Sequence, residues 1–140
     1  GFGPGGVYRL EGESISNTYL DFLRSLGCCA IEINCHIKMD LARLISLDPK
    51  KLEKFQYVSI HAPGSGITYG DNEQTHTIFS LFERFNEASA IDLVCMHPDR
   101  FDDFSVLDMY SHLPIGLENM DHKKPADSTR RSLGNFYKEN

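Results

Sequence analysis

The sequence predicts an α/β fold made of parallel βα units. Short segments that alternate apolar and polar residues are separated by segments with helical periodicity, at intervals of about 20 to 35 residues. The 140-residue chain is 41% hydrophobic and 24% charged, which is typical of a globular domain and unlike a disordered segment. Two architectures fit this pattern, an open doubly wound sheet and part of a (βα)8 barrel. We expect residues 1–140 to form a single domain.

The first half of the chain predicts a helix, a strand and two short helices. Apolar residues recur at three- and four-residue steps over residues 15–26, and Gly27 ends the pattern. Residues 30–35 (AIEINC) alternate with a period of two, which is typical of a strand. Helical spacing returns over residues 39–46 and 49–55, and the second of these segments opens with an Asp-Pro pair that supplies a cap and a first-turn proline.

The second half predicts three more strands and the helices between them. Residues 57–61 (YVSIH) read as a strand, and residues 73–87 as a long amphipathic helix. Residues 91–97 (IDLVCMH) form the next predicted strand, which a proline ends. A short helix at 106–110 and a strand at 115–120 (IGLENM) follow. The order of elements predicts a parallel sheet with helical crossovers.

Each predicted strand has one aliphatic face and a second face that carries polar residues. Because side chains alternate along a strand, position fixes the face. On the polar faces, His61, His97 and Glu118 stand at or near the carboxyl ends of three consecutive strands. Parallel α/β proteins place their chemistry at this edge. We therefore expect these three side chains to converge, with Glu32 on the same face of the preceding strand.

Two imidazoles and one carboxylate are a common ligand set for a divalent metal. The sequence thus predicts a metal site made of His61, His97 and Glu118, holding Zn²⁺ or Mn²⁺, with Mg²⁺ as a further option. Such an ion polarises a carbonyl or hydroxyl oxygen, or activates water. Glu32 and Glu118 are the candidate catalytic carboxylates, and Glu32 is alternatively a further ligand. His36 and His122 border the expected edge and are second-rank candidates.

Charge and cysteine content bound the partners and the compartment. Fourteen Lys and Arg against twenty Asp and Glu give a net charge of −6, which disfavours broad nucleic-acid binding without excluding a local basic groove. No stretch approaches the roughly 20 apolar residues of a membrane span. The four cysteines have no metal-binding or redox spacing, so we expect buried free thiols and a cytoplasmic protein.

Four runs of the sequence resemble successive strands of the xylose-isomerase-like TIM barrels. The runs are AIEIN (30–34), YVSIHAP (57–63), LVCMHPD (93–99) and IGLENMD (115–121). This superfamily groups sugar isomerases and epimerases with the family 2 apurinic endonucleases of the endonuclease IV type. The motifs HAP, HP and EN, which close consecutive strands, are the specific part of the resemblance.

The resemblance implies barrel closure and a metal precedent. In the endonuclease branch a strand-end His, the His of an HP motif and the Glu of an EN motif bind metal, which corresponds here to His61, His97 and Glu118. A full barrel has eight strands and about 250 residues. This chain supplies four clear strands and at most the end of an earlier one at residues 2–6. We therefore expect a partial barrel, about the first five strands of eight, that forms a homo-oligomer or pairs with a missing C-terminal half.

Three functions follow from these expectations. The first is a divalent-metal-dependent isomerase or epimerase acting on a small sugar or sugar phosphate. The second is an endonuclease-IV-like zinc phosphodiesterase acting on abasic DNA, which the acidic balance and the missing basic stripe disfavour. The third is a non-catalytic partial barrel. Because DNA binding weakens steeply as salt rises, salt dependence separates the first two.

Overall fold

Four parallel strands form the sheet that organises the molecule. The computed structural model describes residues 15–35, 43–88 and 90–118. Its strands are β1 (Ala30–Asn34), β2 (Tyr57–His61), β3 (Leu93–Met96) and β4 (Ile115–Leu117). They lie in the order β1-β2-β3-β4, so each described strand pairs with the next one along the chain. This order has no reversal of the kind that defines a doubly wound sheet, and the described strands do not close into a barrel.

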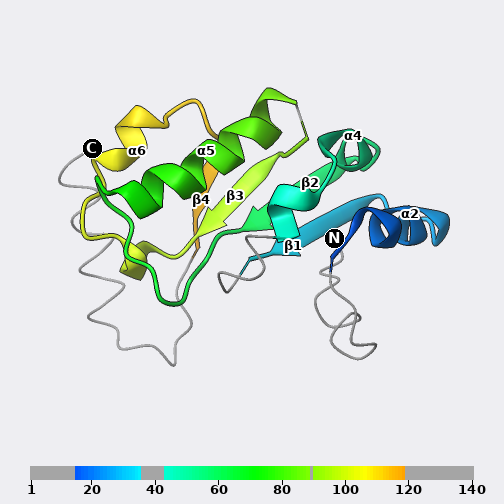
Figure 1. Ribbon diagram of the computed structural model, residues 1–140, viewed down its shortest axis with the longest axis horizontal. Helices are drawn as coiled ribbons and strands as arrows, with labels where there is room; N and C mark the ends of the chain where they lie inside the picture. The colour runs from blue at the N-terminus through cyan, green and yellow to red at the C-terminus, as the bar shows by residue number, and fades with distance from the viewer. Residues whose placement is uncertain (1–14, 36–42, 89, 119–140) are drawn as a thin grey trace.

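The helices follow one another along the same side of this sheet (Figure 1). They are α2 (Asn17–Ser25), α4 (Pro49–Leu52), α5 (Glu73–Glu87) and α6 (Val106–Met109). Residues 43–46 are also helical. Right-handed crossovers between strands that always advance in one direction place every connecting helix on the same face, which explains this one-sided arrangement.

Side-chain caps fix where three of the helices begin. Ser16, Asp48 and Asn72 each accept a hydrogen bond from a backbone N–H in the first turn of α2, α4 and α5. Such a bond satisfies one of the N–H groups that have no partner at a helix start. Ser16 is the residue that caps α2, the predicted Asp-Pro start of α4 is confirmed, and α5 has the predicted bounds.

The face of the sheet that the helices cover is the core. Its side chains are all at most 2% exposed, namely Ile31, Ile33, Val58, Ile60, Val94 and Met96. The buried face of α5 contributes Phe79, Phe82 and Phe85 to the same cluster, and each of these rings is fully buried. Burying one such side chain stabilises the fold by roughly 1.5–3 kcal/mol, so this layer is the main source of stability.

The opposite face of the sheet is only partly covered. Asn34, His61 and Cys95 occupy one row across β1, β2 and β3. Glu32 lies on this face one row deeper, opposite Ser59. The side chains from β1 and β3 are half-buried, in contrast to the sealed core face. The predicted alternation of faces is therefore confirmed.

β2 has the bounds that the sequence predicted, whereas β1 and β3 are shorter than predicted and β4 ends at Leu117. β3 begins at Leu93 instead of residue 91, because the Asp92 carboxylate accepts the Val58 N–H at 2.7 Å while the Asp92 N–H donates to the Val58 carbonyl at 2.8 Å. This side-chain contact takes a place that a strand pair would otherwise fill.

The cysteines are all free, but the prediction that they are buried is wrong for three of them. Only Cys35 is buried, whereas Cys29 is exposed in the turn between α2 and β1 and Cys28 is half-buried. Cys95 is half-buried because its parity places it on the partly covered face.

Several predictions fall outside the described residues. These are the strand end at residues 2–6, His36, His122, the start of the helix predicted at 39–46 and the end of the strand predicted at 115–120. None of the helices in the described ranges has the length and apolar character needed to span a bilayer.

Candidate metal centre

His61 is the last residue of β2, and backbone hydrogen bonds hold it from both sides. The Cys35 N–H donates to the His61 carbonyl at 2.9 Å, and the Ala62 N–H donates to the Cys95 carbonyl at 2.9 Å. The strand end is therefore tied to both neighbouring strands. Its side chain is only 10% exposed, which is low for an imidazole at a sheet edge.

His97 follows β3 and precedes a tight turn, the 3-10 helix η1 (Pro98–Arg100). A residue before proline favours extended backbone, and His97 has φ −84° and ψ 121°. Glu118 follows β4, and its N–H donates to the Met96 carbonyl at 2.8 Å. The same local pattern, a ligand-type residue just past a strand, thus recurs on adjacent strands.

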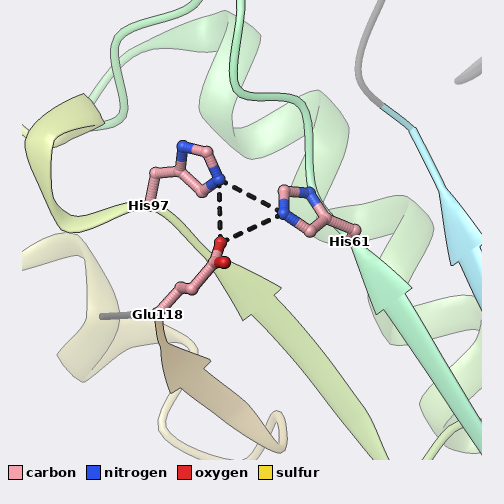
Figure 2. Close-up of side chains that lie close together, drawn as sticks. All are labelled: His61, His97 and Glu118. Carbon is pink, nitrogen blue, oxygen red and sulfur yellow. Dashed lines mark hydrogen bonds and ion pairs between the residues drawn. The ribbon is translucent and has the colours of Figure 1, made fainter. Parts of the chain in front are cut away.

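The three side chains converge at the carboxyl edge of the sheet (Figure 2). His97 Nε2 lies 3.2 Å from His61 Nε2 and 2.9 Å from Glu118 Oε2. His61 Nε2 lies 3.3 Å from Glu118 Oε2. Among the described residues this is the one group of three or more potential ligands whose atoms approach one another closely enough to share an ion.

The spacing of these atoms fits a metal ion. Ligand atoms bound at about 2.1 Å stand about 3.0 Å apart at a right angle and about 3.4 Å apart at the tetrahedral angle. The observed separations of 2.9 to 3.3 Å match this range. Three ligands leave further coordination positions for water or substrate.

The Nδ1 contact of His61 leaves its Nε2 lone pair facing the other two candidate ligands. His61 Nδ1 lies 3.0 Å from the Ala62 carbonyl oxygen, which can only accept, so Nδ1 carries the proton and donates. In the neutral ring, Nε2 then presents a lone pair to His97 Nε2 and to the Glu118 carboxylate. Lone pairs and a carboxylate that face one another repel unless a proton or a cation lies between them. A metal ion among the three atoms, or a proton on His97 Nε2, removes this repulsion with no change of tautomer at His61.

The loop after β2 and the loop after β3 contact each other beside the site. The Tyr69 hydroxyl donates to the Pro63 carbonyl at 2.8 Å, and Tyr69 pairs with Phe101 as an isolated β-bridge. Burial, and secondarily the charge of Cys35, raises the pKa of the Tyr69 phenol, so it stays a donor at neutral pH. The loop after β2 is thereby fixed against the loop after β3, which brings Gly64 against the His97 ring.

Glu32 does not reach the cluster of His61, His97 and Glu118. It shares their face of the sheet, but its row is two residues deeper than that of His61. Cys95 lies beside His61 in the sheet, and its pKa is raised by burial and then by the charges of Glu118 and Glu32. Its thiol is therefore neutral at pH 7.

The remaining described histidines belong to the helical layer. His76 lies 2.8 Å from an Asp71 carboxylate oxygen and 2.9 Å from the Tyr110 hydroxyl. His112 lies 2.9 Å from a Glu83 carboxylate oxygen. His76 lies within α5 and His112 follows α6, so neither stands at the carboxyl end of a strand.

Three residues at the site were missed by sequence reasoning: Gly64, Tyr69 and Asp99. Asp99 lies two residues after His97 within the HPD run, which was the one available signal. Its side chain is 14% exposed and one carboxylate oxygen lies 4.0 Å from His97 Nδ1. Gly64 and Tyr69 had no signal beyond loop composition, because their roles depend on how two loops pack.

Comparison with known proteins gives no relative: no family model, curated protein or solved structure matches this chain. What the site can do therefore follows from its own geometry.

Proposed function

We propose that this chain is a divalent-metal-dependent enzyme of the isomerase or epimerase kind, acting on a small sugar or sugar phosphate. The observation that carries the proposal is the convergence of His61 Nε2, His97 Nε2 and Glu118 Oε2 within 2.9 to 3.3 Å of one another. Zn²⁺ or Mn²⁺ suits this mixed nitrogen and oxygen set, and Mg²⁺ suits it less well. When bound, the ion would polarise a carbonyl or hydroxyl oxygen of the substrate.

The partly covered face of the sheet supports this function. The order β1-β2-β3-β4 and the one-sided helices are what a partial TIM barrel requires, with the partly covered face as its interior. The carboxyl edge of that interior is where such barrels bind substrate. A barrel built from this chain needs further strands, which a second copy or a C-terminal half would supply.

We assign three residues to metal binding and a fourth to proton transfer. His61, His97 and Glu118 hold the ion. Glu32, on the same face and outside the ligand cluster, is the candidate base that moves a proton between neighbouring carbons of the substrate. The net charge of −6 favours a small substrate over a nucleic-acid backbone.

The test uses the chain loaded with Mn²⁺ or Zn²⁺ and a panel of aldose and ketose phosphates in D2O, followed by proton NMR. We expect deuterium to enter at the carbon next to the carbonyl. Glu32→Gln should keep the metal and lose exchange, whereas His97→Ala should lose both. Exchange that is equally fast in Glu32→Gln contradicts the assigned base.

Incubating the same metal-loaded chain with abasic DNA, and measuring strand cleavage, separates the other two functions. Cleavage that is lost in His97→Ala and weakens steeply with salt would replace the isomerase by a zinc phosphodiesterase. A retained metal with turnover of neither substrate class would identify a non-catalytic partial barrel.

A further inference from the structure

The edge of the His97 ring that faces away from the ligand cluster, at Nδ1, also has close neighbours. His97 Nε2 points to His61 and Glu118, so Nδ1 points into the protein. A β-carbon added to Gly64 would lie 3.3 Å from Nδ1, which shows that the backbone of the loop after β2 lies against this edge of the ring. The absence of a side chain at Gly64 leaves the space beside Nδ1 to another group.

That group is the carboxylate of Asp99. Its Oδ1 lies 4.0 Å from His97 Nδ1 and 3.9 Å from Arg100 Nε. The Asp99 side chain is only 14% exposed, and aspartate is seldom buried to this degree unless it is paired. Two groups that can carry positive charge therefore face this carboxylate, one from the candidate ligand and one from the next residue.

The turn after β3 puts Asp99 in this place. The Arg100 N–H donates to the His97 carbonyl at 3.1 Å, which closes the tight turn around Pro98. The Tyr69 N–H then donates to the Arg100 carbonyl at 2.7 Å, which fixes the turn to the loop after β2. Asp99 is thus folded back toward the ring that precedes it, and its location is set by backbone contacts.

We infer that Asp99 is the positioning residue for His97: its carboxylate holds the proton of His97 on Nδ1, so that Nε2 presents a lone pair to a metal. This inference rests on the proposed function, because it assigns Asp99 to a ligand of the proposed ion. Metal-bound histidines regularly donate their other N–H to a carboxylate or carbonyl, which fixes the tautomer and the ring orientation. His61 does so through the Ala62 carbonyl. Asp99 completes the same arrangement at His97 after a movement of about 1 Å, which brings the 4.0 Å separation within hydrogen-bond range.

The test measures Zn²⁺ affinity by competition with a chromophoric chelator, for the full chain and three variants. We expect Asp99→Ala to weaken binding by about 10- to 100-fold, which is the usual effect of losing such a partner. Asp99→Asn keeps a hydrogen-bond acceptor and should lose less. Asp108→Asn, which removes the same charge from an exposed position of α6, should bind Zn²⁺ as the unaltered chain does.

A second readout separates positioning from a merely structural role. In the Zn²⁺-loaded chain, nitrogen-15 NMR should show the His97 Nδ1–H as a slowly exchanging signal that Asp99→Ala loses while the fold is kept. Unchanged affinity and an unchanged Nδ1–H signal in Asp99→Ala would overturn the inference. Failure of the unaltered chain to bind Zn²⁺ would instead overturn the proposed function.

Discussion

Replacing Gly64 by alanine tests whether the loop after β2 sets the position of the His97 ring. The added β-carbon would lie 3.3 Å from His97 Nδ1 and 3.4 Å from Cε1. Carbon contacts are ordinarily about 3.5–4.0 Å, so the ring or the loop must move by a few tenths of an ångström. Metal–ligand distances tolerate only about 0.2 Å. We expect metal affinity to fall about tenfold, which corresponds to about 1.4 kcal/mol.

The matched control is Gly66→Ala in the same loop. Gly66 has φ +70°, and a β-carbon there would meet nothing within 4 Å. That variant should lose about 1–2 kcal/mol of stability from the left-handed backbone and keep its metal affinity. Calorimetric titration with Zn²⁺ and urea unfolding measure the two effects separately. Wild-type affinity in Gly64→Ala, with Gly66→Ala behaving as expected, would refute the reasoning.

Three further predictions concern the packing of the fold. Tyr69→Phe leaves the buried Pro63 carbonyl without its O–H donor, so urea unfolding should show a loss of about 1–3 kcal/mol. Because burial raises the pKa of Tyr69 above that of an unfolded tyrosine, near 10, the unfolded chain releases this proton first and stability falls above about pH 10. Unfolding measured at pH 8 and pH 10.5 should show a smaller fall in Tyr69→Phe, and an equal fall would count against this role. Phe79→Ala removes a fully buried ring that packs edge-on against Tyr110 and should cost about 3–5 kcal/mol, whereas Phe22→Ala, whose residue is 47% exposed, should cost under about 1 kcal/mol.

The candidate site could be placed from sequence because period-two alternation fixes a face. Alternation places His61, His97 and Glu118 opposite the aliphatic residues of their own strands, and parallel pairing of consecutive strands then brings them to one edge. The bounds of α5 were likewise predictable, because its apolar residues recur at helical spacing, namely Ile78, Phe79, Phe82 and Phe85.

What sequence could not supply depends on packing between segments far apart in the chain. The approach of Gly64 to His97 arises only after Tyr69 and Phe101 join the two loops. The early start expected for β3 failed because the Asp92 side chain takes a backbone partner, which composition does not reveal. The exposure of Cys29 was missed because an apolar residue type does not show which way a turn faces.

The central claim is that His61, His97 and Glu118 bind one divalent ion, and metal content measures it most directly. The purified chain is loaded with Zn²⁺ or Mn²⁺, freed of excess ion by gel filtration and analysed by mass spectrometry, beside the His61→Ala/His97→Ala double variant. We expect about one equivalent in the unaltered chain and none in the folded double variant. An unaltered chain without metal after loading, or a double variant that holds as much, would contradict the account.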